Sequence, residues 1–319
     1  MVGGGNRTKS PSLRLAALLH DIGHAPFSHV SDDLFADEIG SHEEMSARLI
    51  LNSELTPIIS RIGDEFDFSP SEVAGLIKGK FKSEYKLLFQ IFSSELDADK
   101  MDYLLRDSHF AGVEYGRYDF HRVVQNLTVH SQGGIWELAV DIGGLHAVEA
   151  FVLARYFMFT QVYLHKTRRI YDKIMIEFLK SILPDGKLPA DPEEFLKWDD
   201  VYVLQKSKEM KNKNVWAERF VNRKHLKLVR EVFPHASEED RVVLKQIKEE
   251  IEKEFDVSSV FVDEYTQKPV MFQKEDGEPT IQIIDRRRDQ RAAPFYVKSK
   301  VIERFNEPIY IYRIYADED

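Results

Sequence analysis

Histidines and carboxylates gather in one short segment of the chain. The stretch 19–42 reads LHDIGHAPFSHVSDDLFADEIGSH and holds four of the 11 histidines, namely His20, His24, His29 and His42. His20 and Asp21 follow directly on an apolar run at 13–19. Because buried polar groups are costly unless they are paired or bind a ligand, this segment is a candidate binding site. The alternative is a set of polar residues that cap helix ends.

Two further segments each place polar side chains along one face of a helix. The first stripe, in the segment 94–110, consists of Asp99, Tyr103 and Asp107, flanked by Lys100 and Arg106. The second consists of Arg155, Phe159, Tyr163 and Lys166. Either stripe alone is more typical of a solvated helix face with ordinary ion pairs.

The three features together indicate a site for a phosphorylated ligand. Carboxylates and imidazoles hold divalent metals, and such a metal lowers the pKa of bound water and polarises a phosphoryl oxygen. Lysine and arginine bind phosphates, and tyrosine packs on a sugar or a base. The chain has no cysteine, so a metal would have to sit on histidine and carboxylate side chains.

Composition narrows the classes of protein that the chain fits. The 319 residues are 43% apolar, enough for a sizeable core, and the formal net charge of −10 argues against non-specific coating of DNA or RNA. The chain contains no run of 18 apolar residues, and its first ten residues have no apolar signal segment. These features predict a soluble, cytoplasmic protein with no membrane partner.

The elements that must position these residues are mainly helices. Apolar periodicity predicts helices over 13–19, 43–62, 71–79, 94–110, 146–183, 191–207, 213–232 and 238–255. In the helix over 94–110, Ser94 and Asp97 are expected to form a capping box. Gly133-Gly134 between two β-type runs predicts a hairpin within 121–145. Strands are expected at 257–265, 279–285, 294–299 and 307–315, so the fold class is mainly α with a small C-terminal α+β appendage.

The motifs resemble those of a known family. They are HDIGHAPFSH at 20–29, SHEE at 41–44, ELDADKMDYLLRDSHFAG at 95–112, and YLHK at 163–166 after Arg155. On these residues the chain resembles the HD-domain phosphohydrolases, and among them the SAMHD1-like deoxynucleoside triphosphate triphosphohydrolases. The resemblance implies an HD-domain helical bundle at 1–183, a helical extension at 184–255 and a strand-rich α+β region at 256–319.

The resemblance also implies a role for each matching residue. The metal ligands would be His20, Asp21 and Asp99. The catalytic group near the α-phosphate would be His29, His42, Glu43 and the pocket histidine His24. The triphosphate contacts would be Lys100, Tyr103 and Arg155, and the deoxyribose contacts Asp107 and Tyr163. The implied reaction is attack of water at the α-phosphorus, which releases a deoxynucleoside and intact triphosphate.

Cofactors and partners follow from the same resemblance. The cofactor would be a divalent metal ion (Mg, Mn, Fe, Ni or Zn), and the protein would be a homo-oligomer, either a dimer or a tetramer. A nucleotide effector would act at a basic cluster in the tail, for which a solvated basic loop is the alternative. The residues of this basic cluster are Arg286, Arg287, Arg288, Arg291, Lys298 and Lys300.

The chain departs from the family pattern near its start. The family's metal site uses another histidine on an earlier helix, and none of the residues 1–19 is a histidine. The resemblance therefore predicts that the family's N-terminal helices and one metal ligand are missing. Two alternatives to dNTP hydrolysis follow: a catalytically weakened or inactive nucleotide-binding or assembly subunit, or an HD phosphohydrolase that acts on another nucleotide.

Overall fold

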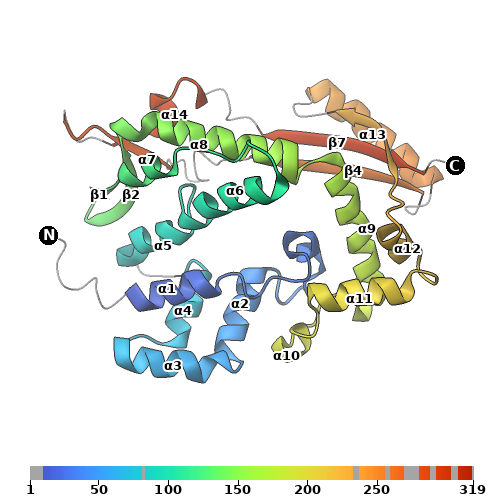
Figure 1. The fold of residues 1–319 in the computed structure, drawn as a ribbon, viewed down its shortest axis with the longest axis horizontal. Coiled ribbons are helices and arrows are strands. Elements are labelled where there is room, and N and C mark those ends of the chain that lie inside the picture. Colours follow the sequence, from blue (N-terminus) through green and yellow to red (C-terminus); the bar gives the residue numbers. More distant parts are fainter. Residues whose placement is uncertain are drawn as a thin grey trace. The chain divides into compact units, whose positions relative to one another are not determined.

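The protein is mainly α-helical, with a strand-containing region toward the C-terminus, which confirms the predicted fold class; a hairpin lies in the middle of the chain (Figure 1). The computed structural model describes residues 10–80, 83–232, 237–255, 259–268, 280–287, 292–302 and 308–317. The chain forms two compact units, each built from two stretches of sequence. The first unit comprises 1–85 and 171–225, and the second comprises 86–170 and 226–319. The predicted division into three consecutive domains stays a prediction.

The first unit is built of short helices from both of its stretches of sequence. Its elements are α1 (Ser10–Leu19), η1 (Ser28–Leu34), α2 (His42–Leu51), α3 (Leu55–Phe66), α4 (Pro70–Ile77), η2 (Ser83–Tyr85), η5 (Pro184–Gly186), α10 (Pro192–Phe195), α11 (Asp200–Met210), α12 (Val215–Val221) and the part of α9 (Lys166–Ile182) from Tyr171 onward. Helix α2 packs against α3 and α4, and α1 packs against α4. Met45, Ile50, Ile59 and Val73 are at most 2% exposed, so these apolar faces form the core of the first unit.

Local sequence explains where these helices begin. Ser41 caps α2 by accepting the Glu44 N–H, and Ser69 caps α4 in the same way with Pro70 in the first helical turn. The single helix predicted over 43–62 is wrong, because α2 ends at Leu51 and α3 begins at Leu55. The Ser53 hydroxyl donates to the Leu49 carbonyl and accepts the Leu55 N–H, and this local bonding replaces helical hydrogen bonds.

The second unit combines helices with two small sheets. Its helices are α5 (Lys86–Phe92), α6 (Ala98–Ala111), α7 (Phe120–Gln125), η3 (Ile142–Gly144), α8 (Leu145–Met158), the π-helical turn η4 (Phe159–Tyr163), α13 (Glu238–Glu254) and α14 (Phe295–Lys298). Its strands are β1 (Leu127–Gln132), β2 (Ile135–Asp141), β3 (Lys227–Val232), β4 (Val260–Gln267), β5 (Gln282–Ile284), β6 (Ala292–Pro294) and β7 (Ile309–Ala316). The sheet orders are β1-β2-β5-β6 and β3-β7-β4.

The predicted hairpin is confirmed in the first of these sheets. Strands β1 and β2 pair antiparallel, with Gln132 opposite Ile135. Gly133 and Gly134 have φ values of 60° and 84°, the left-handed backbone that a two-residue hairpin turn requires. Helix α8 lies in the core of this unit, where Phe151, Val152 and Met158 are at most 1% exposed.

Four other predicted elements in the second unit need correction. Residues 227–232 form strand β3 instead of the end of a helix, because they pair with β7. Residues 295–298 form helix α14 where a strand was expected. The long helix over 146–183 is interrupted by η4 and by the turn at 164–165. Helix α6 begins at Ala98 with Asp97 as its N-cap, so Ser94 does not start it, although the Ser94 N–H does donate to Asp97.

One stretch in the described part of the chain, Ile142–Tyr163, is long and apolar enough to cross a membrane. Within that stretch, 44% of the 18-residue window is buried inside the protein. It includes α8, whose apolar side chains fill the core described above.

Candidate functional site

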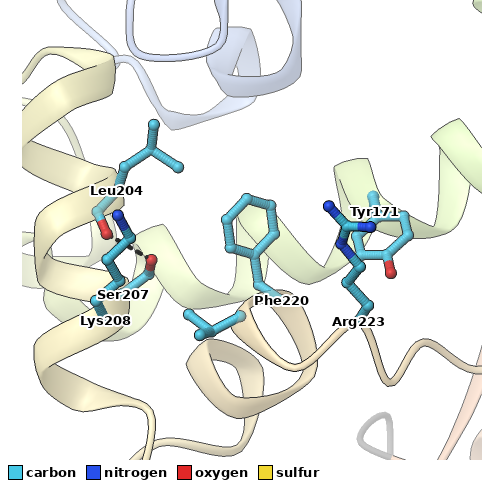
Figure 2. Close-up of a pocket in the computed structure, with 7 residues that line it drawn as sticks. Tyr171, Leu204, Ser207, Lys208, Phe220 and Arg223 are labelled. Carbon is cyan, nitrogen blue, oxygen red and sulfur yellow. Dashed lines mark hydrogen bonds between the residues drawn. The ribbon is translucent and has the colours of Figure 1, made fainter.

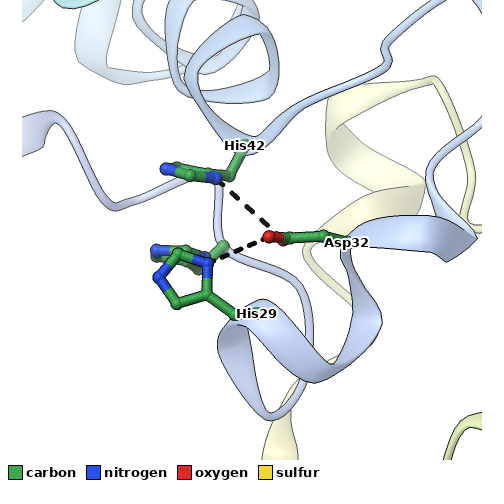
Figure 3. Close-up of side chains that lie close together, drawn as sticks. His29, Asp32 and His42 are labelled. Carbon is green, nitrogen blue, oxygen red and sulfur yellow. Dashed lines mark hydrogen bonds and ion pairs between the residues drawn. The ribbon is translucent and has the colours of Figure 1, made fainter. Parts of the chain in front are cut away.

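Three histidines and one aspartate meet in the first unit (Figure 3). His24, His29, Asp32 and His42 each offer one ligand atom, and these atoms all lie within 4.8 Å of one another. The rings of His24 and His42 stack with centroids 4.0 Å apart. Nδ1 of His29 lies 2.9 Å from Oδ2 of Asp32, and Nδ1 of His42 lies 4.0 Å from Oδ1. We refer to these four residues as the histidine cluster.

A close backbone approach holds the two sides of this cluster together. The Gly23 N–H donates to Oγ of Ser46 on α2 at 2.9 Å, and the Ser46 hydroxyl donates to the His20 carbonyl at 2.6 Å. A Cβ atom at Gly23 would lie 2.3 Å from the Ser46 nitrogen and 2.4 Å from the His42 carbonyl oxygen. Glycine is therefore required where the turn after α1 meets α2, and this contact brings His24 against His42.

A strained turn presents His29. Phe27 and Ser28 both have positive φ, 61° and 54°, a conformation that non-glycine residues rarely adopt. The Phe27 N–H donates to Oδ1 of Asp200 at 2.8 Å, and the Ser31 hydroxyl donates to the Pro26 carbonyl. These bonds stabilise the reversal of the chain between His24 and His29.

Burial and charge set the protonation of the cluster. Burial, followed by repulsion from His42, lowers the pKa of His24 to about 4, so this imidazole is neutral at pH 7. Burial alone would raise the pKa of Asp32, but its hydrogen bond with His29 and the neighbouring histidines outweigh burial and lower it. The pKa of Glu43 is lowered in the same manner, since bonds from Ser41 and its own N–H outweigh burial. Both carboxylates are therefore ionised at neutral pH.

His20 and Asp21 lie at the edge of the histidine cluster. Nε2 of His20 is 3.2 Å from Oδ1 of Asp21, and Nε2 of His24 is 3.6 Å from the same oxygen. Nδ1 of His20 contacts the Ala17 carbonyl at 2.9 Å, which orients the ring. On the other side, Oε1 of Glu43 lies 3.4 Å from Nε2 of His42. The first unit thus brings together six of the predicted site residues: His20, Asp21, His24, His29, His42 and Glu43.

The second unit brings the two predicted stripes together. Tyr163 donates its hydroxyl proton to Oδ2 of Asp107 at 2.7 Å, which joins the end of η4 to α6. The rings of Tyr103 and Tyr163 lie edge to face at 6.3 Å. Asp99 lies one turn before Tyr103 on α6 and is partly buried. Tyr163 therefore contacts both Asp107 and Tyr103, which does not fit the alternative of a fully solvated helix face for these three residues.

The two cations predicted to contact the triphosphate, Lys100 and Arg155, are already paired with carboxylates. Nζ of Lys100 donates to Oδ2 of Asp97 at 2.6 Å. Arg155 is 7% exposed, donates to Glu95, and lies over the ring of Phe159 at 5.8 Å. Nε of Arg155 is buried and has no hydrogen-bond partner among the described residues. An anionic oxygen of a ligand would satisfy this donor.

Both tyrosines stay neutral. Burial raises the pKa of Tyr103 to about 12. The pKa of Tyr163 is also raised, first by burial and then by its hydrogen bond to Asp107. Each phenol therefore remains protonated, and so a hydrogen-bond donor, across the physiological pH range.

Sequence reasoning missed three residues that the structure places at these sites. Asp32 completes the histidine cluster, Ser46 joins the two sides of it, and Glu95 pairs with Arg155. Only Asp32 has a local signal, because it follows His29 by three residues and so lies on the same face of η1. Of the basic tail cluster, Arg286 lies 3.8 Å from Asp141, whereas Arg288 and Arg291 fall outside the described residues. An effector role for that cluster stays a prediction.

The donor atoms of the first unit fit a divalent metal. Imidazole nitrogens and carboxylate oxygens suit Zn, Fe, Mn or Ni. Nδ1 of His24 and Oδ1 of Asp32 are buried atoms without a hydrogen-bond partner in the described part of the chain, as expected of groups that await a ligand. His20 and Asp21 supply two further donors beside them. The remaining predicted ligand, Asp99, belongs to the second unit.

A separate pocket of about 480 Å³ opens in the first unit between α9, α11 and α12 (Figure 2). It is lined by Tyr171, Leu204, Ser207, Lys208, Phe220, Val221 and Arg223. Its walls are mainly apolar, and none of the predicted site residues is among them.

Family models match most of the chain. A model described as "HD domain" matches residues 5–107, and one described as "HD associated region" matches 118–273. Among curated proteins, the uncharacterized protein YwfO of Bacillus subtilis is 34% identical over 165 residues, 51% of this chain and 35% of that protein. The SAMHD1 homolog of Dictyostelium discoideum, a deoxynucleoside triphosphate triphosphohydrolase by name, is 30% identical over 213 residues, 62% of this chain and 39% of that protein.

Solved structures extend the likeness over nearly the whole chain. A hypothetical protein from Aquifex aeolicus superposes with a TM-score of 0.79 at 31% identity, covering 96% of this chain and 77% of that one. A phosphohydrolase from Bacteroides thetaiotaomicron gives a TM-score of 0.71 at 23% identity, which shows a shared fold; the match covers 99% of this chain and 82% of that one. The chain spans little more than a third of the first curated relatives, 35% and 38% of their lengths.

Proposed function

Since the chain belongs to the HD-domain family, we propose that it is a metal-dependent phosphohydrolase that cleaves deoxynucleoside triphosphates to deoxynucleoside and inorganic triphosphate. The observation that carries the proposal is the histidine cluster, which gathers three imidazoles and a carboxylate beside the His20-Asp21 pair. Relatives named as deoxynucleoside triphosphate triphosphohydrolases support the choice of substrate.

In the proposed reaction, water attacks the α-phosphorus and the bond from that phosphorus to the 5′ oxygen breaks. The water loses a proton, and the 5′ oxygen must gain one. His20, Asp21 and Asp99 would hold the divalent metal, which when bound polarises a phosphoryl oxygen. Proton transfer and substrate binding would be carried out by the protein's own side chains.

His29 is the proposed proton carrier. Its Nδ1 is hydrogen bonded to Asp32, which fixes the ring, and its Nε2 would exchange a proton with substrate or water. The lowered pKa of Asp32 keeps the carboxylate anionic and able to stabilise an imidazolium. His29 is 69% exposed, so the ring is accessible to a ligand.

His42 is the proposed second proton carrier. Its Nδ1 faces Asp32 and its Nε2 faces Glu43, so both ring nitrogens have a carboxylate nearby. A histidine between two carboxylates can take a proton at one nitrogen and release one from the other. His24, neutral and stacked on His42, would pack against the α-phosphate without adding a second positive charge.

The second unit would recognise the triphosphate and the sugar. The unpartnered Nε of Arg155 and the ammonium of Lys100 would donate to phosphate oxygens, as would the neutral Tyr103 hydroxyl. Asp107 accepts from Tyr163 through Oδ2, and its carboxylate would also accept from the 3′-hydroxyl. With the ring of Tyr163 against C2′, a ribose 2′-hydroxyl would have no room and no partner.

Product analysis tests the proposal. The purified chain is incubated with each dNTP and Mn²⁺, and the products are separated by ion-exchange chromatography. We expect deoxynucleoside and tripolyphosphate in equal amounts, loss of turnover in His29→Ala, and normal turnover in the control His121→Ala, an exposed histidine on α7. Release of pyrophosphate or orthophosphate would overturn the reaction type.

A further inference from the structure

The turn that follows Tyr163 is a weak point in the long helical segment. The π-helical turn η4 ends at Tyr163, and α9 begins at Lys166. The Leu164 N–H still donates to the Phe159 carbonyl at 2.8 Å. The Val162 carbonyl accepts the His165 N–H at 3.2 Å, and the Tyr163 carbonyl accepts from Nη1 of Arg168 at 2.6 Å. Leu164 is only 2% exposed, so water cannot readily bond its carbonyl.

Strand β7 bonds the Leu164 carbonyl and the start of α9 from a distant part of the sequence. Nη1 of Arg313 donates to the Leu164 carbonyl at 2.6 Å, and the Tyr315 hydroxyl donates to the Lys166 carbonyl at 2.9 Å. Arg313 and Tyr315 are 2% and 1% exposed. Nε of Arg313 also donates to Glu231 on β3, which holds the guanidinium in place.

Neighbouring side chains reinforce the same contact. Ile309 and Ile311 of β7 pack with Leu164 in one buried apolar cluster. Asp263 on β4 accepts from Nε of Arg169 at 3.0 Å in a two-pronged ion pair. All three strands of the sheet β3-β7-β4 therefore take part in holding the chain after Tyr163.

We propose that Arg313 and Tyr315 are positioning residues that act through Tyr163 and so set discrimination between deoxyribose and ribose. Tyr163 is bonded to Leu164, the residue that Arg313 holds, and its hydroxyl must reach Asp107 at 2.7 Å. A shift of the turn would move the phenol away from C2′ of the sugar. This role in specificity rests on the proposed function, whereas the positioning itself does not.

Strand β7 contains a matched control for the test. Tyr312 is 1% exposed, like Tyr315, and its hydroxyl also donates to a backbone carbonyl, that of Leu244 at 2.7 Å. Leu244 lies on α13, away in sequence from the turn after Tyr163. Tyr315→Phe and Tyr312→Phe therefore each remove one buried hydroxyl-to-carbonyl bond from the same strand. Only the first of them touches the turn.

The kinetic measurement is the ratio of kcat/KM for a dNTP to kcat/KM for the matching rNTP. We expect Tyr315→Phe to lower this ratio several-fold, mainly by raising turnover of the rNTP, while Tyr312→Phe leaves it unchanged. Arg313→Lys should lower it further, because one ammonium cannot hold both Glu231 and the Leu164 carbonyl in the planar geometry of a guanidinium. Equal effects of Tyr315→Phe and Tyr312→Phe would reduce Tyr315 to a general structural role.

Amide hydrogen exchange measures how well the turn after Tyr163 is ordered, and it does so independently of enzymatic activity. The Leu164 and His165 amides should exchange faster in Tyr315→Phe and in Arg313→Lys, and at the wild-type rate in Tyr312→Phe. Unchanged exchange at these two amides in both variants would overturn the proposal. If the wild-type chain turns over no dNTP, the proposed function fails, and the exchange rates still decide whether β7 orders the turn.

Discussion

Gly23 offers the sharpest single-residue test of how the histidine cluster is assembled. In Gly23→Ala, the new Cβ would lie 2.3 Å from the Ser46 nitrogen and 2.4 Å from the His42 carbonyl oxygen, both of them backbone atoms. Ordinary contact begins at 3.4 Å, so α2 and the turn after α1 would have to separate by about 1 Å. That movement would also stretch the Gly23 to Ser46 hydrogen bond.

The separation has two expected costs. Overpacking of a buried contact destabilises a fold by about 1–3 kcal/mol. A misplacement of about 1 Å between reacting groups lowers turnover by about 100-fold. His42 and Glu43 begin α2, whereas His20 and His24 flank Gly23, so the displacement falls between the two halves of the cluster.

The assay pairs dNTP turnover with thermal unfolding, and Gly133→Ala is the control. Gly133 has a φ of 60° and nothing within 4 Å of an added Cβ. Its substitution therefore costs about 1–2 kcal/mol of backbone strain without moving any site residue. Gly133→Ala should keep the wild-type rate of turnover. Gly23→Ala should turn over about 100-fold more slowly, although its stability should be similar to that of Gly133→Ala. Wild-type turnover in Gly23→Ala would refute the argument that this contact sets the geometry of the cluster.

Two further changes test separate parts of the account. Asp32→Asn removes the charged partner of His29, so kcat should fall by about 100-fold while the melting temperature stays near that of the wild type; an unchanged kcat would exclude a role for Asp32 in proton transfer. The pKa of Glu177 is lowered because bonds and charges from Lys173 and Lys180 outweigh burial. Its folded pKa thus lies below the ordinary 4.5, so it stabilises the fold above that pH, and this contribution is lost as pH falls through the folded pKa. Glu177→Gln should be less stable than wild type at pH 7, with a stability gap that narrows as the pH falls below the ordinary pKa of 4.5, and a gap constant with pH would contradict the ion-pair argument.

Local sequence signals predicted the elements that depend on local chemistry. The Gly133-Gly134 turn acts within a few residues and is found in the structure. The predicted helix starts at 43 and 71 lie within one residue of the starts of α2 and α4, where the structure adds the caps Ser41 and Ser69. The motif at 20–29 likewise predicted that histidines would gather in the first unit.

Elements that depend on distant partners could not be predicted in this way. Strand β3 forms because residues 227–232 pair with β7, more than 75 residues later in the chain. The break at 159–165 is stabilised by Arg313, whose contact with Leu164 has no trace in the local pattern. The sequence alone does not distinguish Ser46 from any other small residue on a buried helix face, because its role depends on the hydrogen bond between its hydroxyl and the Gly23 N–H.

The most direct test of the central claim is the fate of solvent oxygen during hydrolysis. The wild-type chain is incubated with dNTP and Mn²⁺ in water enriched in ¹⁸O, and the products are analysed by mass spectrometry. Attack at the α-phosphorus predicts one ¹⁸O atom in the tripolyphosphate and none in the deoxynucleoside. Label in the deoxynucleoside, or label in a deoxynucleoside monophosphate released with pyrophosphate, would contradict the proposed reaction.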